Sequence, residues 1–72
     1  MPHTKDDLDR ARRHVEEGEV RVAEQIERVA KLKRLGRPTE QSEIFLRQMI
    51  EILDGMRLHL KEIEQDVHPP RF

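Results

Sequence analysis

Two pairs of residues in this chain have the types and the spacing of metal ligands. His14 is followed three positions later by Glu17, and His59 is followed three positions later by Glu62. Residues three apart are neighbours on a helix surface, so each imidazole would lie beside a carboxylate. Bundles that hold two metal ions use the reverse order, Glu-x-x-His, with further inward-facing glutamates. The core positions here are aliphatic, so the sequence predicts no metal and no other cofactor, and we expect His14 and His59 at a helix interface.

A second candidate site is a cluster of basic residues near the middle of the chain. Basic side chains contact the phosphates of nucleic acids. They also stabilise the C-terminal end of a helix, and Glu40 and Glu43 follow closely enough to neutralise the cluster. Nucleic-acid binding is therefore kept only as an alternative function. The cluster consists of Lys31, Lys33, Arg34 and Arg37.

The composition excludes several classes of protein. Fourteen basic residues nearly balance fifteen acidic ones, and two phenylalanines are the only aromatic residues, so a general nucleic-acid binder is not expected. The absence of cysteine excludes disulfides and thiolate metal sites. The start is charged and no apolar run approaches the roughly 20 residues of a membrane span, so we expect a cytoplasmic protein without a signal peptide. No nucleophile–base pair or phosphate-binding loop can be built, so we expect no enzyme activity.

Helix signals divide the chain into two long helices. Thr4 is a good N-cap, and Asp7 three residues later suits a capping box. Gly36 tolerates the left-handed conformation that often ends a helix, and Pro38 prevents simple continuation. Thr39 is placed to cap the second helix.

These signals predict helices over about 4–35 and 39–67, a turn at 36–39 and a short tail at 68–72. A connection this short favours antiparallel neighbours over separate domains. The sequence therefore predicts a single all-α domain, 1–72, built as a two-helix antiparallel hairpin.

Apolar residues recur every seven positions in both helices, as in a coiled coil. Folding the chain about the turn makes the numbers of facing residues add to about 75. With heptad positions lettered a to g, the a residues Leu8, Val15, Val22 and Val29 then face Val67, Leu60, Leu53 and Leu46. The d positions hold Ala11, Gly18, Gln25 and Leu32 in the first helix and Met49, Met56 and Ile63 in the second, with Gly18 facing Met56 and Ala11 facing Ile63. We call these a and d residues the core seam.

One flank of the core seam supports the same alignment through charge. On this flank the alignment places Ile26 opposite Ile50. It also places three pairs of oppositely charged residues opposite each other. The pairs are Arg12 with Glu64, Glu19 with Arg57, and Lys33 with Glu43.

The opposite flank is unlike a solvated surface. On this flank the second helix contributes two large apolar residues, a glycine and a histidine. The first helix contributes two arginines and a histidine. A single two-helix seam buries little apolar surface, which predicts that this flank is covered. We expect a homodimeric four-helix bundle, or contact with another helical protein. The surface, here called the Phe45 flank, consists of Phe45, Ile52, Gly55 and His59 with His14, Arg21 and Arg28.

The numbers of His14 and His59 add to 73, so the two histidines should face each other on this flank. Partial burial and mutual repulsion in a dimer would disfavour their protonation. We therefore expect stability above about pH 6.5 that declines at lower pH, whether or not this acts as a biological switch.

The stretch HVEEGEVRVAEQIERVAKLKRLGRPT resembles short, uncharacterised helical-hairpin proteins of alphaproteobacteria such as rhizobia. The residues that carry the resemblance are His14, Val15, Gly18, Arg21, Val22, Gln25, Val29, Leu32, Gly36, Thr39 and the later His59. The resemblance implies a bacterial source and a hairpin, and it implies no activity. From the residues themselves we expect a small non-enzymatic interaction or regulatory module that acts through helix–helix contacts. The alternative is a nucleic-acid accessory protein that uses the basic cluster.

Overall fold

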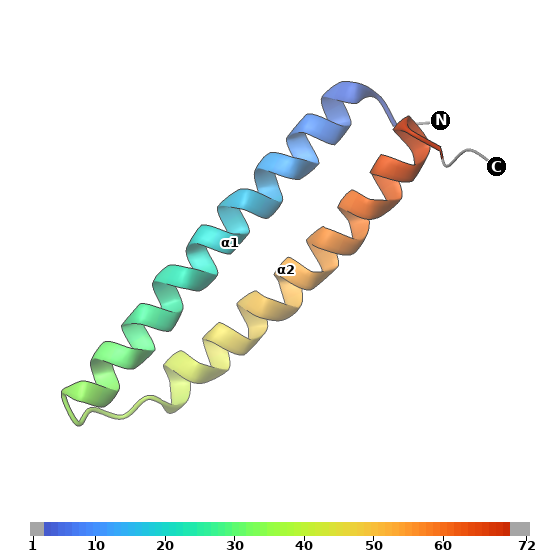
Figure 1. Ribbon diagram of the computed structural model, residues 1–72. Coiled ribbons are helices and arrows are strands. Elements are labelled where there is room, and N and C mark those ends of the chain that lie inside the picture. The colour runs from blue at the N-terminus through green and yellow to red at the C-terminus, as the bar shows by residue number, and fades with distance from the viewer. Residues whose placement is uncertain (1–2, 70–72) are drawn as a thin grey trace.

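The computed structural model describes residues 3–69, which form two helices that lie side by side (Figure 1). Helix α1 spans Lys5–Arg34 and helix α2 spans Glu40–Val67. The helices run antiparallel and pack against each other in a rod 54 Å long (Figure 1). The predicted all-α hairpin is confirmed, and the predicted boundaries differ from the observed ones only by the residues that cap each helix.

The start of α1 is fixed by a reciprocal pair of hydrogen bonds. The Asp7 backbone N–H donates to the Thr4 hydroxyl oxygen at 3.2 Å, and the Thr4 backbone N–H donates to the Asp7 carboxylate at 3.0 Å. Two backbone donors that the helix leaves unpaired are thereby satisfied. The predicted capping box is confirmed.

The end of α1 is closed by the Schellman pattern of backbone hydrogen bonds. The N–H of Arg37 donates to the carbonyl of Leu32 at 2.9 Å, and the N–H of Gly36 donates to the carbonyl of Lys33 at 3.1 Å. This pattern requires a left-handed residue, and Gly36 has a φ of 67°. The predicted role of Gly36 is confirmed.

The start of α2 differs from the prediction at Thr39. Thr39 is the N-cap residue, but its side chain makes no capping hydrogen bond. Its φ of −117° and ψ of −3° explain this, because a capping side chain needs an extended backbone. Its carbonyl still accepts from the Glu43 N–H at 2.8 Å, and the acidic residues Glu40 and Glu43 occupy the first turn, where the helix dipole favours them.

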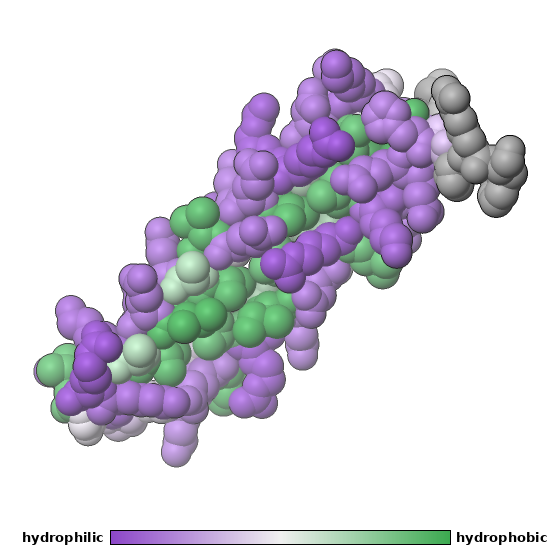
Figure 2. All heavy atoms as spheres, in the orientation of Figure 1, coloured by the Kyte–Doolittle hydropathy of each residue, from purple (hydrophilic) through white to green (hydrophobic). Residues whose placement is uncertain are grey.

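The core seam lies between the helices over the whole length of the rod. Every predicted a and d residue is buried or half-buried. Hydrophobic side chains follow the line between the helices, and hydrophilic side chains cross it (Figure 2). At the end away from the turn, three buried residues form a cluster against which two half-buried residues pack: Leu8, Ala11 and Ile63, with Leu60 and Val67.

Gly18 marks a close approach of α2 to α1. A Cβ atom at this position would lie 3.0 Å from Cδ1 of Leu53 and 3.7 Å from Cε of Met56. The predicted contact with Met56 is therefore present, and Leu53 approaches even more closely. Glycine leaves the space that these two side chains fill.

One flank of the core seam is bridged by the three ion pairs that the sequence predicts. The N–O distances are 3.8 Å for Arg12–Glu64, 3.7 Å for Arg57–Glu19 and 3.1 Å for Lys33–Glu43. Such exposed pairs add little to stability, but they confirm the relative alignment of the helices.

Candidate interaction surface

The Phe45 flank of the hairpin contains an open groove of about 460 Å³ between the helices. Phe45 and Ile52 of α2 line it from one side, and His14 and Arg21 of α1 line it from the other. The buried Leu53 lies at its base. The structure thus brings four residues of the predicted surface to one groove.

The other residues of the Phe45 flank lie beyond this groove. His59 lines a smaller hollow of about 220 Å³ toward the open end of the hairpin, which His14 and His3 also line. Arg28 lies near the turn, in a shallow hollow with Glu24 and Lys31. Gly55 is exposed, and an added Cβ there would have no atom within 4 Å. Apart from Gly55, the residues of the predicted surface are therefore spread over three hollows and do not form a single pocket.

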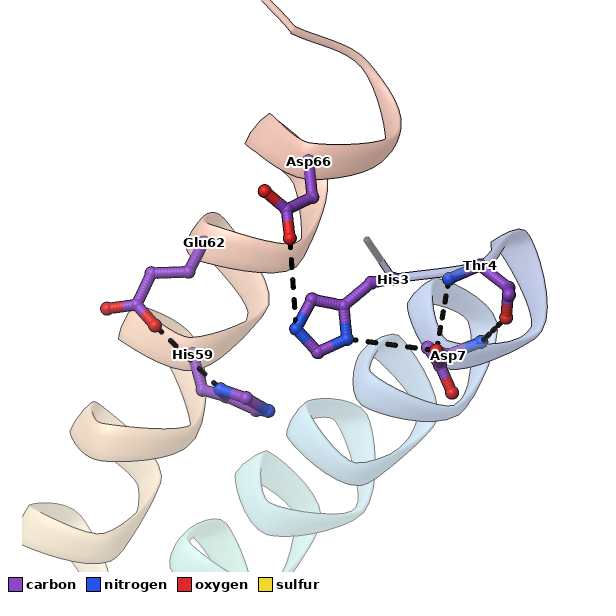
Figure 3. A network of polar contacts seen from close by, with 6 residues as sticks. All are labelled: His3, Thr4, Asp7, His59, Glu62 and Asp66. Atoms are coloured by element: carbon purple, nitrogen blue, oxygen red, sulfur yellow. Dashed lines mark hydrogen bonds and ion pairs between the residues drawn. The ribbon is translucent and has the colours of Figure 1, made fainter. Parts of the chain in front are cut away.

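His3, which sequence reasoning missed, connects the two helices at the open end (Figure 3). Its Nδ1 lies 3.7 Å from Oδ2 of Asp7 on α1, and its Nε2 lies 3.9 Å from Oδ2 of Asp66 on α2. Its ring meets that of His59 edge to face, with centroids 5.9 Å apart. These polar distances exceed those of hydrogen bonds, so the contacts attract only when the imidazole is protonated. The position of His3 directly before the Thr4 cap is the signal that could have placed it there.

The capping box also sets the acidity of Asp7. The hydrogen bond from the Thr4 backbone N–H lowers the pKa of the Asp7 carboxyl, and the Thr4 hydroxyl and nearby His3 and Arg10 act in the same direction. A donor to the charged carboxylate stabilises that form. Asp7 is therefore held as an anion at the start of α1.

His14 and His59 are both exposed in the single hairpin. His59 Nδ1 lies 3.9 Å from a Glu62 carboxylate oxygen one turn along the helix (Figure 3). The single hairpin therefore does not provide the burial that the expected acid sensitivity requires. Within residues 3–69, no three histidine, aspartate or glutamate side chains are arranged to hold a metal ion.

A second feature that sequence reasoning missed is a hydrogen bond through the core seam. The side-chain amide nitrogen of Gln25 donates to the backbone carbonyl oxygen of Ser42 at 3.0 Å. Gln25 is buried. A glutamine at a d position among aliphatic residues was the available signal, because a polar residue in a coiled-coil core commonly fixes register.

The basic cluster near the turn has acidic neighbours. Lys33 pairs with Glu43, and Lys31 and Arg34 line a hollow together with Glu24 and Glu27. Two acidic side chains thus lie among the basic ones of that hollow. The cluster is less free to contact phosphates than its composition indicates.

Within the described part of the chain, neither helix combines the length and the apolar character needed to cross a membrane. Comparison with protein-family models, with curated proteins and with solved structures finds no match for this chain. The function must therefore be argued from the surface of the hairpin itself.

Proposed function

We propose that this chain is a small non-enzymatic interaction module that works through helix–helix contacts, with a second copy of the chain bound on the Phe45 flank. Two hairpins joined in this way form a four-helix bundle. The groove beside Phe45 and Ile52 receives side chains of the second copy.

The observation that carries the proposal is the amount of apolar surface that the hairpin leaves exposed. Among residues 3–69, six hydrophobic side chains are buried, whereas eight large ones remain exposed. Ile52 is 65% exposed and Phe45 is 52% exposed. These two side chains line one groove, and apolar side chains gathered in this way on a small protein mark an interaction site.

The Phe45 flank fits a partner better than the opposite flank does. On the opposite flank, charged side chains of α1 and α2 reach across the core seam and pair with one another. Within the described residues 3–69, the contact that bridges the Phe45 flank is the one between His3 and Asp66, at the open end. The middle of this flank therefore stays open, and the groove lies there.

A second copy is the partner that the chemistry of α2 favours. The stripe of α2 that contains the groove residues Phe45 and Ile52 has no charge for four turns, because its other members are Gln41, Gln48 and Gly55. In a two-fold dimer the same surface patch faces itself. The α2 side of the flank can do so without bringing like charges together, while Arg21 and Arg28 lie on its α1 side.

The proposal is tested by measuring the molar mass with light scattering in wild type and in Ile52→Asp. We expect a wild-type dimer at micromolar concentration and a monomer with largely lost helicity in the variant, because a buried unpaired charge is costly. Leu58→Asp is the matched control. Leu58 is 61% exposed on the same helix but lies off the Phe45 flank, so this variant should remain a folded dimer.

A folded wild-type monomer at micromolar concentration would refute the proposal, as would equal effects of the two aspartates. The alternative function at the basic cluster is examined by retention of DNA or RNA at about 150 mM salt, where the interaction module should show none. Retention that falls with salt and with Lys31→Glu would favour the alternative.

A further inference from the structure

We infer that the two copies pair with their hairpins antiparallel, so that the turn end of each lies beside the open end of its partner. The inference rests on the proposed self-association through the Phe45 flank. It adds the direction and the alignment of the second copy.

The first argument is the distribution of charge along the flank. Near the turn, Arg28 of the flank is followed by Lys31 one turn along α1, and near the open end His59 of the flank is followed by Glu62 and Asp66 one and two turns along α2. A parallel pair would place each set beside its own copy, which repels. An antiparallel pair places the basic set of one hairpin at the same end of the bundle as the acidic set of the other.

Charges of the opposite sign lie near both sets and reduce the difference in charge between the two ends of the flank. Glu24 and Glu27 share a hollow with Arg28, Lys31 and Arg34, so three basic residues outnumber two acidic ones there. At the open end, Arg10 lies close enough to Asp7 to lower its pKa.

The second argument is the position of the charged residues along the long axis of the hairpin. Arg21 and Ile52 line the same groove, and their numbers add to 73, close to the sum for facing residues, so they mark about one level of the hairpin. Lys31 lies ten residues from Arg21 toward the turn, and Glu62 lies ten residues from Ile52 toward the open end. Each step corresponds to about 15 Å of helix. A two-fold axis at the level of Ile52 therefore brings Lys31 to the height of the partner's Glu62.

The third argument concerns the largest side chain on the flank. Phe45 precedes Ile52 by seven residues, and His59 follows Ile52 by seven residues. The same two-fold axis therefore places Phe45 level with the partner's His59. Gly55 lies one turn from His59, and nothing stands within 4 Å of where its Cβ would be, so the surface there admits a phenyl ring. Aromatic rings in such contact pack edge to face or offset.

The direction is measured with spin labels on single cysteines, because the chain has no cysteine of its own. Lys31→Cys and Glu62→Cys both alter exposed positions. In the antiparallel dimer, two labels at the same site lie about 30 Å apart along the rod, twice the displacement from the axis. A mixed sample with one label at each site should show a short distance between Lys31→Cys and Glu62→Cys. Arg34→Cys keeps the Lys31 and Glu62 charges and should give about 40 Å between identical sites.

Short distances between identical sites, with a long mixed distance, would show a parallel dimer and overturn the inference while leaving the proposed function standing. A dimer in which neither the mixed nor the identical pairs come close would also overturn it, because the contact would then lie on another face. Light scattering that shows a monomer, with no coupling between labels, would refute the proposed function and this inference together.

Discussion

Gln25 and Ser42 are joined across the two helices by a hydrogen bond of 3.0 Å from the glutamine side-chain amide to the serine backbone carbonyl. Gln25 is only 6% exposed. In a shifted alignment of the helices this amide would be buried without its acceptor, which costs free energy. The bond therefore favours one register of an otherwise aliphatic core seam, in the way that single polar core residues do in coiled coils.

Replacement of Gln25 should separate the effect of packing from that of the hydrogen bond. Gln25→Ala removes both, and we expect the free energy of unfolding to fall by about 1–3 kcal/mol. Gln25→Leu restores apolar volume at a d position, so the loss should be smaller. Urea denaturation followed by circular dichroism measures both values, and equal losses would contradict the role assigned to packing.

Leu53 is the buried residue of α2 that closes the base of the groove and approaches Gly18. Leu53→Ala should lower the free energy of unfolding by about 2–5 kcal/mol, because it leaves a cavity in the core seam. Leu58→Ala is the matched control at an exposed position of the same helix and should change it by less than about 0.5 kcal/mol. Similar losses for the two variants would show that Leu53 is not part of the core.

Gly18 tests how tightly the helices approach. Leucine has a better helix propensity than glycine, by somewhat under 1 kcal/mol, so propensity alone predicts that Gly18→Leu raises the melting temperature. The space is already occupied, since a Cβ would lie 3.0 Å from Leu53. We expect overpacking to dominate and to cost about 1–3 kcal/mol. A higher melting temperature in the variant would mean that the helices separate easily at this point.

The capping box predicts a response to acid. Because the pKa of Asp7 is lowered in the folded chain, the unfolded chain binds this proton first as pH falls. The stability that the carboxylate contributes is present above the unfolded pKa of about 3.9 and is lost as pH falls through the folded value. Melting temperatures from pH 5 to 2 should therefore fall more steeply in wild type than in Asp7→Asn. Parallel curves would assign the whole acid response to other carboxylates.

Heptad spacing and helix punctuation were sufficient to predict the architecture. Pro38 and Gly36 mark the turn, and residues seven apart identify the buried face, because both signals depend on local backbone chemistry. The ion pairs followed from the same alignment, since charged residues beside the seam of an antiparallel pair meet at fixed offsets.

The features that sequence reasoning missed depend on details that no periodic pattern contains. Thr39 has the right type for a capping side chain, but the turn gives it a backbone conformation that prevents the bond. His3 lies outside both helices, so only the path of the chain before Thr4 brings it between Asp7 and Asp66. The Gln25 hydrogen bond ends on a backbone carbonyl, and the residue type at position 42 gives no sign that its carbonyl is the acceptor.

The cluster of Leu8, Ala11 and Ile63 lies at the end of the rod farthest from the turn, and this position affects how the chain folds. Contacts beside the turn close short loops, whereas Leu8 and Ile63 are 55 positions apart in the sequence. Their contact carries a larger loop-closure entropy, and it forms only when both helices are aligned over most of their length. If the helices paired from the turn over only half of their length, these side chains would remain exposed to water. We therefore expect refolding to be cooperative, without a populated hairpin that is paired only beside the turn.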